Sequence, residues 1–167
     1  MFESCVNIVL QKEGGFVNHS ADPGGATNYG ITIKVLSEYR KTEVSVEDVQ
    51  RLSIGEAKQI YYKNYWKPIQ GDQLPIGVNL SVFDFAVNAG VSRAAKTLQK
   101  IVNVQQDGTI GLVTLKAVQT FDVEDMIERL AAERVLFYRS LKTFSVFGKG
   151  WLRRTDSIKI ASLEMLK

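Results

Sequence analysis

The chain has 167 residues, of which 45% are hydrophobic and 23% charged, and its formal net charge at pH 7 is +3. This length suits one domain, or one domain with a small appended lobe, and the apolar content is ample for a buried core. No apolar run approaches the ~20 residues that a transmembrane helix needs. A single cysteine and a single histidine, Cys5 and His19, exclude an internal disulfide and a structural zinc site.

The opening segment, MFESCVNIVLQKEGG, predicts an amphipathic helix. Its apolar residues recur at intervals of three and four, which is the helical period, and Cys5 belongs to this apolar face. The pair Gly14–Gly15 is a usual end for such a helix. Glu3 precedes the apolar residues, and a basic leader and a small-residue cleavage site are lacking, so the segment does not read as a secretory signal. We therefore expect the protein to be made in a cytoplasm.

Helices are also expected to dominate the rest of the chain. The capping-box pattern, a serine with an acid three positions later, opens helices at Ser45 and Ser53, and the second runs through Tyr62 or Trp66 to a Lys-Pro stop. Extended structure is expected only near TNYGIT, residues 27–32. Further helices are expected over residues 75–90, 93–104 (capped by Ser92), 114–118, 123–142 and 150–167, with the turn QQDGTIG between the second and third. The predicted fold class is mostly α, with a small β excursion after the first helix.

Positive charge gathers at the C-terminal end. Residues 140–167 carry six lysines or arginines against two acids, a net charge of +4, so the remainder of the chain has a net charge of −1. Such a segment favours polyanions, such as nucleic acid, teichoic acid or an anionic membrane face, although a solvated helix face is the plainer alternative. Trp151, Ile158 and Met165 fall near one helical face. We therefore expect the terminal helix to dock on the core and to present only a weakly basic face.

The stretch EGGFVNHSADPGGATNYGIT, from Glu13 to Thr32, combines five glycines with two carboxyl groups. Glu13 falls in the last turn of the first helix, where the helix dipole disfavours an anion, and the apolar neighbour Phe16 removes water from it. Both effects favour a protonated carboxyl that can donate its proton. Asp22 falls in a loop, held by a Pro-Gly-Gly turn. Two carboxyl groups in different surroundings are the working groups of glycoside hydrolysis, whereas a solvated glutamate and a turn-forming aspartate are the structural alternative.

This stretch resembles the signature of glycoside hydrolase family 108, lysozyme-like N-acetylmuramidases found among phage endolysins and bacterial proteins once called secretion activators. The family's E-G-G-aromatic motif matches residues 13–16, and its D-x-G-G-x-T-N-x-G-I-T element matches residues 22–32. IYYKNYWKPIQGDQLPIGVNLSVFDFAVNAG is similar to the remainder of that catalytic domain. RAAKTLQKIVNVQQDGTIGLVTLKAV resembles the predicted peptidoglycan-binding region that usually follows it.

The resemblance implies a lysozyme-like catalytic lobe over residues 1–91 and a helical peptidoglycan-binding lobe over residues 92–167. The two lobes are expected to pack together, because no Pro-, Ser- or Gly-rich spacer separates them.

The resemblance also implies that Glu13 is the catalytic acid. In the wider phage-lysozyme group, a glutamate is followed after eight residues by an aspartate and after five more by a threonine. Glu13 and Asp22 fit this spacing, but Thr27 follows Asp22 after only four residues, and Asn28 stands at the expected place. Either Asp22 or Thr27 is expected to position or activate the attacking water.

Aromatic side chains that could stack on sugar rings gather on the helix before the Lys-Pro stop. Helical spacing pairs Tyr62 with Trp66 and Tyr61 with Tyr65, and one of these pairs is as well suited to the core as to a groove. Tyr29 belongs to the glycine-rich loop itself and is a stronger candidate contact.

Polar side chains that could bind the sugar substituents occur in the loop and on a later helix. Asn28 is the loop candidate. Asp84 and Asn88 stand four apart on an otherwise apolar helix and share a face, where they serve either as a groove wall or as helix-to-helix hydrogen bonds. His19, alone in a loop, is expected to be a surface or hydrogen-bonding residue. The expected substrate contacts are Asn28, Tyr29, Tyr62, Trp66, Asp84 and Asn88.

The expected function is that of an endolysin-type lysozyme that cleaves the β-1,4 bond between N-acetylmuramic acid and N-acetylglucosamine. Bacterial peptidoglycan is the expected partner of a monomeric protein that needs no metal or cofactor, binds no nucleic acid and has weak contact with anionic membrane or wall polymers. Made in the bacterial cytoplasm, it would reach the wall after release, through a holin-type pore or another export route.

Two other classes of protein are alternatives. A non-catalytic wall-binding or secretion-assisting protein would use LQKIVNVQQDGTIGLVTL as its binding lobe, but the intact Glu13 and Asp22 argue against it. A nucleic-acid binder would use the basic tail, but no recognition motif accompanies that tail. The QQDGTIG turn faintly resembles a calcium loop, and its single aspartate cannot supply the oxygens that calcium requires.

Overall fold

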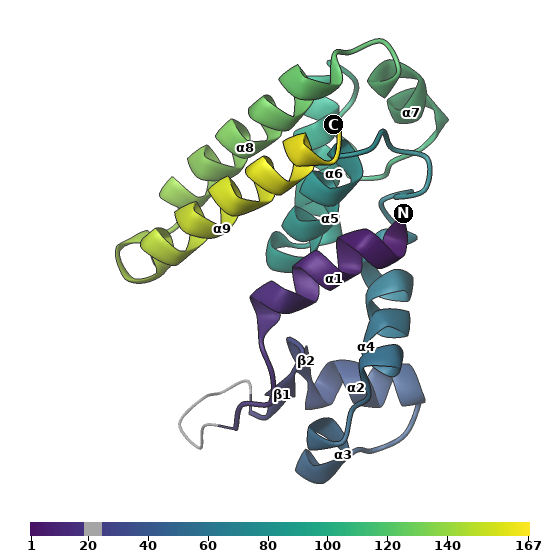
Figure 1. The fold of residues 1–167 in the computed structure, drawn as a ribbon, viewed down its shortest axis with the longest axis vertical. Helices are drawn as coiled ribbons and strands as arrows, with labels where there is room; N and C mark the ends of the chain where they lie inside the picture. The colour runs from purple at the N-terminus through teal and green to yellow at the C-terminus, as the bar shows by residue number, and fades with distance from the viewer. Residues whose placement is uncertain (19–24) are drawn as a thin grey trace. The chain divides into compact units, whose positions relative to one another are not determined.

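The structure is a computed structural model that describes residues 1–18 and 25–167 (Figure 1). Within these ranges the chain is mostly helical, and a small two-stranded sheet follows the first helix, which confirms the predicted fold class. The chain forms two compact units, one from Val6–Asn64 and the other from Met1–Cys5 with Tyr65–Lys167. Helix α1 (Phe2–Glu13) contributes residues to both units.

The smaller unit contains the C-terminal part of α1, a short hairpin and three further helices. Its elements are β1 (Thr27–Asn28), β2 (Ile31–Thr32), α2 (Ile33–Arg40), α3 (Val46–Gln50) and α4 (Ile54–Tyr61). The predicted capping box at Ser45 is present, and the Ser53 side chain accepts a hydrogen bond from the Glu56 amide at the start of α4. Helix α2 was not predicted. It buries only Leu36 and is started by Thr32, whose side chain accepts from the amide of the third residue of the helix.

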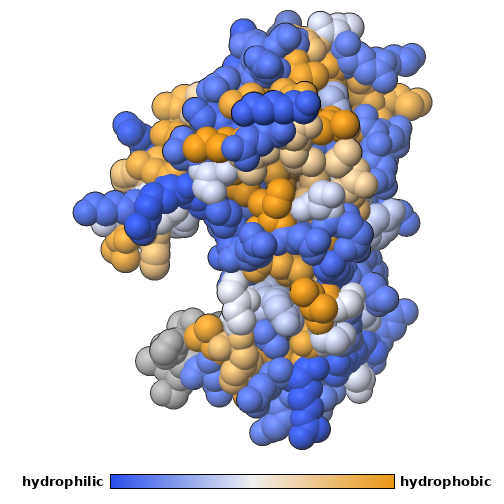
Figure 2. Space-filling view, in the orientation of Figure 1, coloured by the Kyte–Doolittle hydropathy of each residue, from blue (hydrophilic) through white to orange (hydrophobic). Residues whose placement is uncertain are grey.

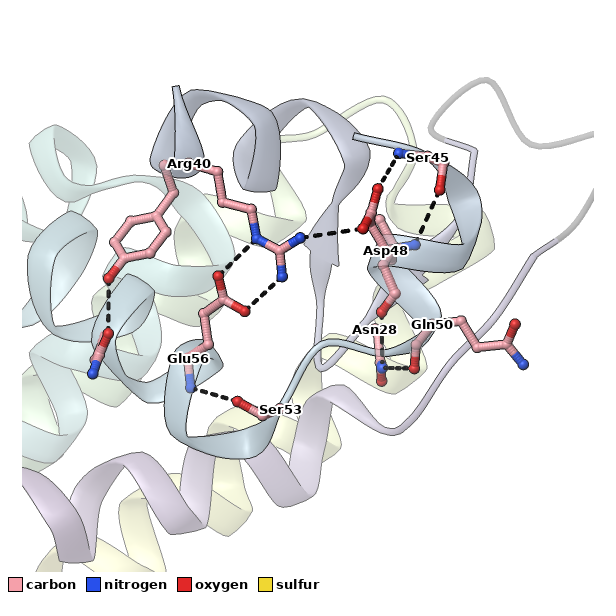
Figure 3. A network of polar contacts seen from close by, with 10 residues as sticks. Asn28, Arg40, Ser45, Asp48, Gln50, Ser53 and Glu56 are labelled. Carbon is pink, nitrogen blue, oxygen red and sulfur yellow. Dashed lines mark hydrogen bonds and ion pairs between the residues drawn. The ribbon is translucent and has the colours of Figure 1, made fainter. Parts of the chain in front are cut away.

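Arg40 ties the three helices of this unit together (Figure 3). Its guanidinium donates two parallel hydrogen bonds to Glu56 on α4, both of 2.8 Å, and a longer one of 3.4 Å to Asp48 on α3. Bidentate pairing of this kind fixes direction as well as distance. The hydrogen bond from Arg40 contributes most to lowering the pKa of Glu56. Helices α2, α3 and α4 therefore hold one another in a fixed arrangement that supports the hairpin.

The larger unit surrounds one central helix. Its helices are α5 (Val78–Ala89), α6 (Val91–Ile101), α7 (Leu112–Val118), α8 (Val123–Arg139) and α9 (Phe144–Glu164). Every residue of α5 from Val78 to Ala86 is buried, and α6, α8 and α9 all pack on it. The predicted division at residues 90–92 falls inside this unit, because α5 and α6 lie on either side of it and pack on each other.

The N-terminal residues of α1 complete the core of the larger unit. The Phe2 ring meets the rings of Trp66 and Phe83 at centroid distances of 5.4 and 6.1 Å. Cys5 is fully buried, as the sequence predicts, and its thiol lies 3.8 Å from the Asn79 side-chain oxygen. Burial raises the pKa of this thiol to about 11, so Cys5 stays protonated and unreactive at neutral pH.

Two helix starts differ from the prediction. Helix α6 begins at Val91 after Gly90, whose φ is +93°, and no side chain caps it, so Ser92 is not its cap. Helix α9 begins at Phe144 and runs straight through Gly148 and Gly150. The Phe144 ring fills the space at Gly148, where a Cβ atom would come within 2.6 Å of it. Gly148, although a residue type that disfavours helices, thus lies within α9 because its missing side chain leaves room for the Phe144 ring.

The turn QQDGTIG is held by one buried glutamine of α6. The Gln99 Nε2 donates to the Asp107 carboxylate, the Thr109 carbonyl and the Thr114 hydroxyl, and its Oε1 accepts from the Gly108 amide. Gln99 is only 1% exposed. A buried side-chain amide with all these partners locks the turn to the helix.

Helix α9 lies alongside α8 in a helical hairpin (Figure 1). Two of its basic residues form ion pairs with acidic side chains of other helices, Arg154 with Asp84 and Lys159 with Glu128. Apolar side chains are exposed near the tip, where Val146 is 73% and Phe147 54% accessible, and Figure 2 shows the apolar surface there. Among the helices of the described ranges, none combines the length and apolar character needed to cross a membrane.

Candidate active site

Glu13 is the last residue of α1, as the sequence predicts. Gly14 follows with φ +75°, a left-handed conformation that ends the helix without the steric cost a side chain would bring. The Glu13 side chain is half-buried. The carboxyl group therefore sits at a helix C-terminus and remains within reach of solvent.

Strand β1 is joined by a backbone bridge to the segment that follows α1. The Val17 and Thr27 backbones exchange two hydrogen bonds, each of 2.8 Å. Thr27 also pairs with Thr32 across the hairpin. The structure thus places Thr27, one of the predicted catalytic residues, in the strand beside the segment that leaves Glu13.

A two-residue turn, Tyr29–Gly30, closes the hairpin. Their φ angles are +51° and +74°, the combination that a type I′ hairpin turn requires. Asn28 anchors its base, donating from Nδ2 to the carbonyls of Val49 and Gln50 at 3.1 and 3.2 Å (Figure 3). Asn28 is only 6% exposed. Its predicted role as a substrate contact is therefore replaced by a structural one.

The tip of this turn meets the Glu13 carboxyl group. A Cβ atom placed on Gly30 would lie 2.8 Å from Glu13 Oε2 and 2.9 Å from the Tyr61 hydroxyl. The Tyr61 hydroxyl donates a 2.8 Å hydrogen bond to the Tyr29 carbonyl. A carboxyl group, a phenol and a glycine turn therefore converge at one point of the smaller unit.

Asp22, the second predicted catalytic carboxyl, lies outside the described residues, as does His19. The described part of the site is consequently Glu13, Thr27, the Tyr29–Gly30 turn and Tyr61.

The predicted aromatic pairs are divided by a π-helical turn. Residues Tyr62–Trp66 form η1, in which hydrogen bonds join residues five rather than four positions apart. Tyr62 is 40% exposed, whereas Tyr61 and Trp66 are 2% and 0% exposed. Trp66 packs edge-on against Phe83 in the larger core. The structure corrects the assignment of Trp66, which serves the core and presents no face to a sugar.

Asp84 serves the core, and Asn88, which is exposed, contacts a neighbouring helix. The Asp84 carboxylate, with no exposed surface, accepts hydrogen bonds from both Nε and Nη2 of Arg154 and forms a 2.7 Å ion pair with Arg134. Tyr138 donates a hydrogen bond to Asn88. The alternative of helix-to-helix contacts therefore holds for both residues, and Asp84 cannot touch a substrate in this structure.

The site includes two residues that were not predicted as part of it, Gly30 and Tyr61. Gly30 carried a signal, since a glycine after an aromatic residue between two short strands is a typical I′ position. The sequence suggested Tyr61 only as an aromatic that could stack on a sugar, and its contact with the turn carried no signal, because 32 positions separate it from the carbonyl it binds. Within the described ranges no cluster of His, Cys, Asp or Glu side chains could hold a metal ion.

The arrangement places a carboxyl group, which can act as a proton donor, beside the Tyr29–Gly30 turn. A half-buried carboxyl group at a helix end, restrained by the turn, can deliver a proton to an ether oxygen brought to it. Together with the helical fold, these features define a lysozyme-like glycoside hydrolase.

Comparison with known proteins identifies the family. Residues 6–90 match the glycosyl hydrolase 108 family, and the chain belongs to it. The solved structure of SagA from Brucella abortus is similar to the chain, with 43% sequence identity and a TM-score of 0.90 over 98% of this chain and 94% of that one. No curated protein matches the chain. Membership of this family makes the protein a glycoside hydrolase that acts on peptidoglycan.

Proposed function

We propose that the protein is an N-acetylmuramidase that cleaves the β-1,4 bond between N-acetylmuramic acid and N-acetylglucosamine, with Glu13 as general acid. The observation that carries this proposal is the position of Glu13 at the end of α1, half-buried, with its carboxyl group packed against the Gly30 backbone of the turn. Family membership supports the same reaction.

In the proposed reaction, the glycosidic oxygen approaches the Glu13 carboxyl group. Glu13 donates its proton as the bond to the sugar breaks, so that the leaving sugar departs as a neutral alcohol. Asp22 or Thr27 positions or activates the attacking water. Thr27 is suited to this role because its backbone is held by Val17, which leaves the strand fixed beside the site.

Replacing Glu13 by Gln tests the proposal. The amide keeps the size and hydrogen bonding of the side chain but has no transferable proton, so we expect a folded protein that binds peptidoglycan and fails to lyse it. Losing a general acid costs a factor of roughly 10² to 10⁴ in rate. Glu3→Gln, an exposed glutamate of the same helix, is the matched control and should keep the wild-type rate. A Glu13→Gln protein with wild-type activity on the same walls would refute the assignment.

Mass analysis of the digested wall tests the bond. Muramic acid at the new reducing end is the expected result. Glucosamine at that end would indicate a glucosaminidase, and cleaved stem peptides would overturn glycosidase action altogether.

For the biological setting, we propose an endolysin-type role in which the protein, active as a monomer, reaches the wall after release from the cytoplasm. Residues 92–167 would add wall binding. Lys142, Lys149 and Arg153 are exposed near the apolar tip of the α8–α9 hairpin, which supports weak contact with anionic wall polymers or membranes. Binding of the full chain to purified walls at low and high salt measures this contact.

A further inference from the structure

The Tyr29–Gly30 turn is more strongly restrained than a hairpin of two-residue strands requires. Its base is already tied to the end of α3 by two hydrogen bonds from Asn28. The strands pair through Thr27 with Thr32 and Asn28 with Ile31. The hydroxyl of Tyr61 adds one further restraint, and this restraint acts at the tip of the turn, on the Tyr29 carbonyl.

Tyr61 is well placed to hold that tip still. It is the last residue of α4 and is 2% exposed, so its ring is fixed by packing and only the hydroxyl reaches the turn. Tyr29 itself has φ +51°, a conformation that bulky residues rarely adopt, and a hydrogen bond to its carbonyl favours that conformation over extended alternatives.

The position of the tip in turn decides where the Glu13 carboxyl group can lie. Glu13 Oε2 and the Tyr61 hydroxyl both come within 3 Å of the point where a Gly30 Cβ would stand, so the carboxyl group packs directly on the Gly30 backbone. A shift of the turn away from Tyr61 would release that side of the carboxyl group. General acids lose much of their effect when they are displaced by as little as ~1 Å.

We propose that Tyr61 is a positioning residue for Glu13: its hydroxyl fixes the Tyr29–Gly30 turn, and the turn holds the carboxyl group in the orientation that delivers the proton. This inference rests on the proposed role of Glu13. Tyr61 acts through the turn, so its hydroxyl should affect the rate of the chemical step and leave substrate binding unchanged.

The test compares Tyr61→Phe with Tyr39→Phe, each in the full chain and on the same purified peptidoglycan. Both changes remove one hydroxyl that donates one hydrogen bond within the smaller unit, since Tyr39 donates to Gln59 at 2.9 Å on the surface. We expect Tyr61→Phe to lower kcat about tenfold or more with KM unchanged. Tyr39→Phe should match the wild type.

A second measurement separates positioning from general loosening. In a protein that already carries Glu13→Gln, Tyr61→Phe should leave the residual rate unchanged, because no proton donor remains to be positioned. Wild-type kcat in Tyr61→Phe, or a further loss in the double variant equal to the loss in the single one, would overturn the role of Tyr61 while leaving Glu13 as general acid. Full activity of Glu13→Gln alone would overturn both.

Discussion

At the scale of single residues, Gly30 is the position where the fold and the site most strictly require a residue without a side chain. A side chain there would have to adopt φ +74° and would come within 3 Å of both Glu13 and Tyr61. Backbone conformation and space thus exclude a side chain for two separate reasons.

We expect Gly30→Ala to lower stability by about 1–2 kcal/mol for the left-handed backbone and to reduce kcat by about 10- to 100-fold by displacing the Glu13 carboxyl group. Gly90→Ala is the control. Gly90 also has a positive φ, +93°, but no atom lies within 4 Å of the added Cβ, and it belongs to the other unit. Urea unfolding and steady-state rates measure the two effects separately. An equal fall of kcat in both variants would show that strain alone, and not contact with Glu13, lowers the rate.

At the scale of elements, one buried carboxylate joins three helices. Asp84 on α5 contacts Arg154 on α9 at 2.8 Å and Arg134 on α8 at 2.7 Å, the latter as an ion pair outside hydrogen-bond geometry. Asp84 is fully buried and Arg134 is 3% exposed. A buried ion cluster of this kind adds little net stability as a whole. Removing its carboxylate, however, leaves two guanidinium charges in the core without that partner.

We therefore expect Asp84→Asn to destabilise the protein by about 3–5 kcal/mol. Asp156→Asn removes a carboxylate from α9 that is 68% exposed and lies 3.9 Å from Lys159, and it should change stability by less than about 1 kcal/mol. Urea unfolding of both variants measures the difference. A cost for Asp84→Asn as small as that of the control would contradict the importance of this contact for the helix packing.

At the scale of the whole molecule, carboxylates in both units link stability to pH. The backbone amide of Ser45 lowers the pKa of Asp48, and the Arg40 hydrogen bond lowers that of Glu56. Burial raises the pKa of Asp84, but the positive charges of Arg134 and Arg154 and the hydrogen bonds from Arg154 outweigh it and hold this pKa below its usual value.

A lowered pKa in the folded state means that the unfolded chain binds protons first as the pH falls. The stability that these groups contribute is present above about pH 4, the ordinary range of carboxyl groups, and is lost as the pH falls through their folded-state values. We expect the urea midpoint to fall steeply below about pH 4. An Asp84→Asn variant should show a shallower fall, and an unchanged slope in that variant would remove Asp84 from the explanation.

Sequence alone determined the features that depend on neighbours a few positions apart. The end of α1 at Glu13, the serine caps of α3 and α4, and the helical class follow from local hydrogen bonding and from the helical period, which a chain displays without its tertiary partners. The catalytic motif was recognisable for the same reason, since its residues are contiguous.

Tertiary structure alone decided which polar and aromatic residues serve the core and which serve the site. Asp84 finds Arg154 across 70 positions, and the Tyr61 hydroxyl finds the Tyr29 carbonyl across 32. A buried polar group is stable only where a partner is brought to it, and long-range packing supplies that partner. The π-helical turn likewise leaves Tyr62 exposed and Trp66 buried. A regular α-helix places residues four positions apart on the same face and does not predict this difference. Local chemistry thus placed Glu13 at the end of α1, while contacts between distant segments determine what restrains its carboxyl group.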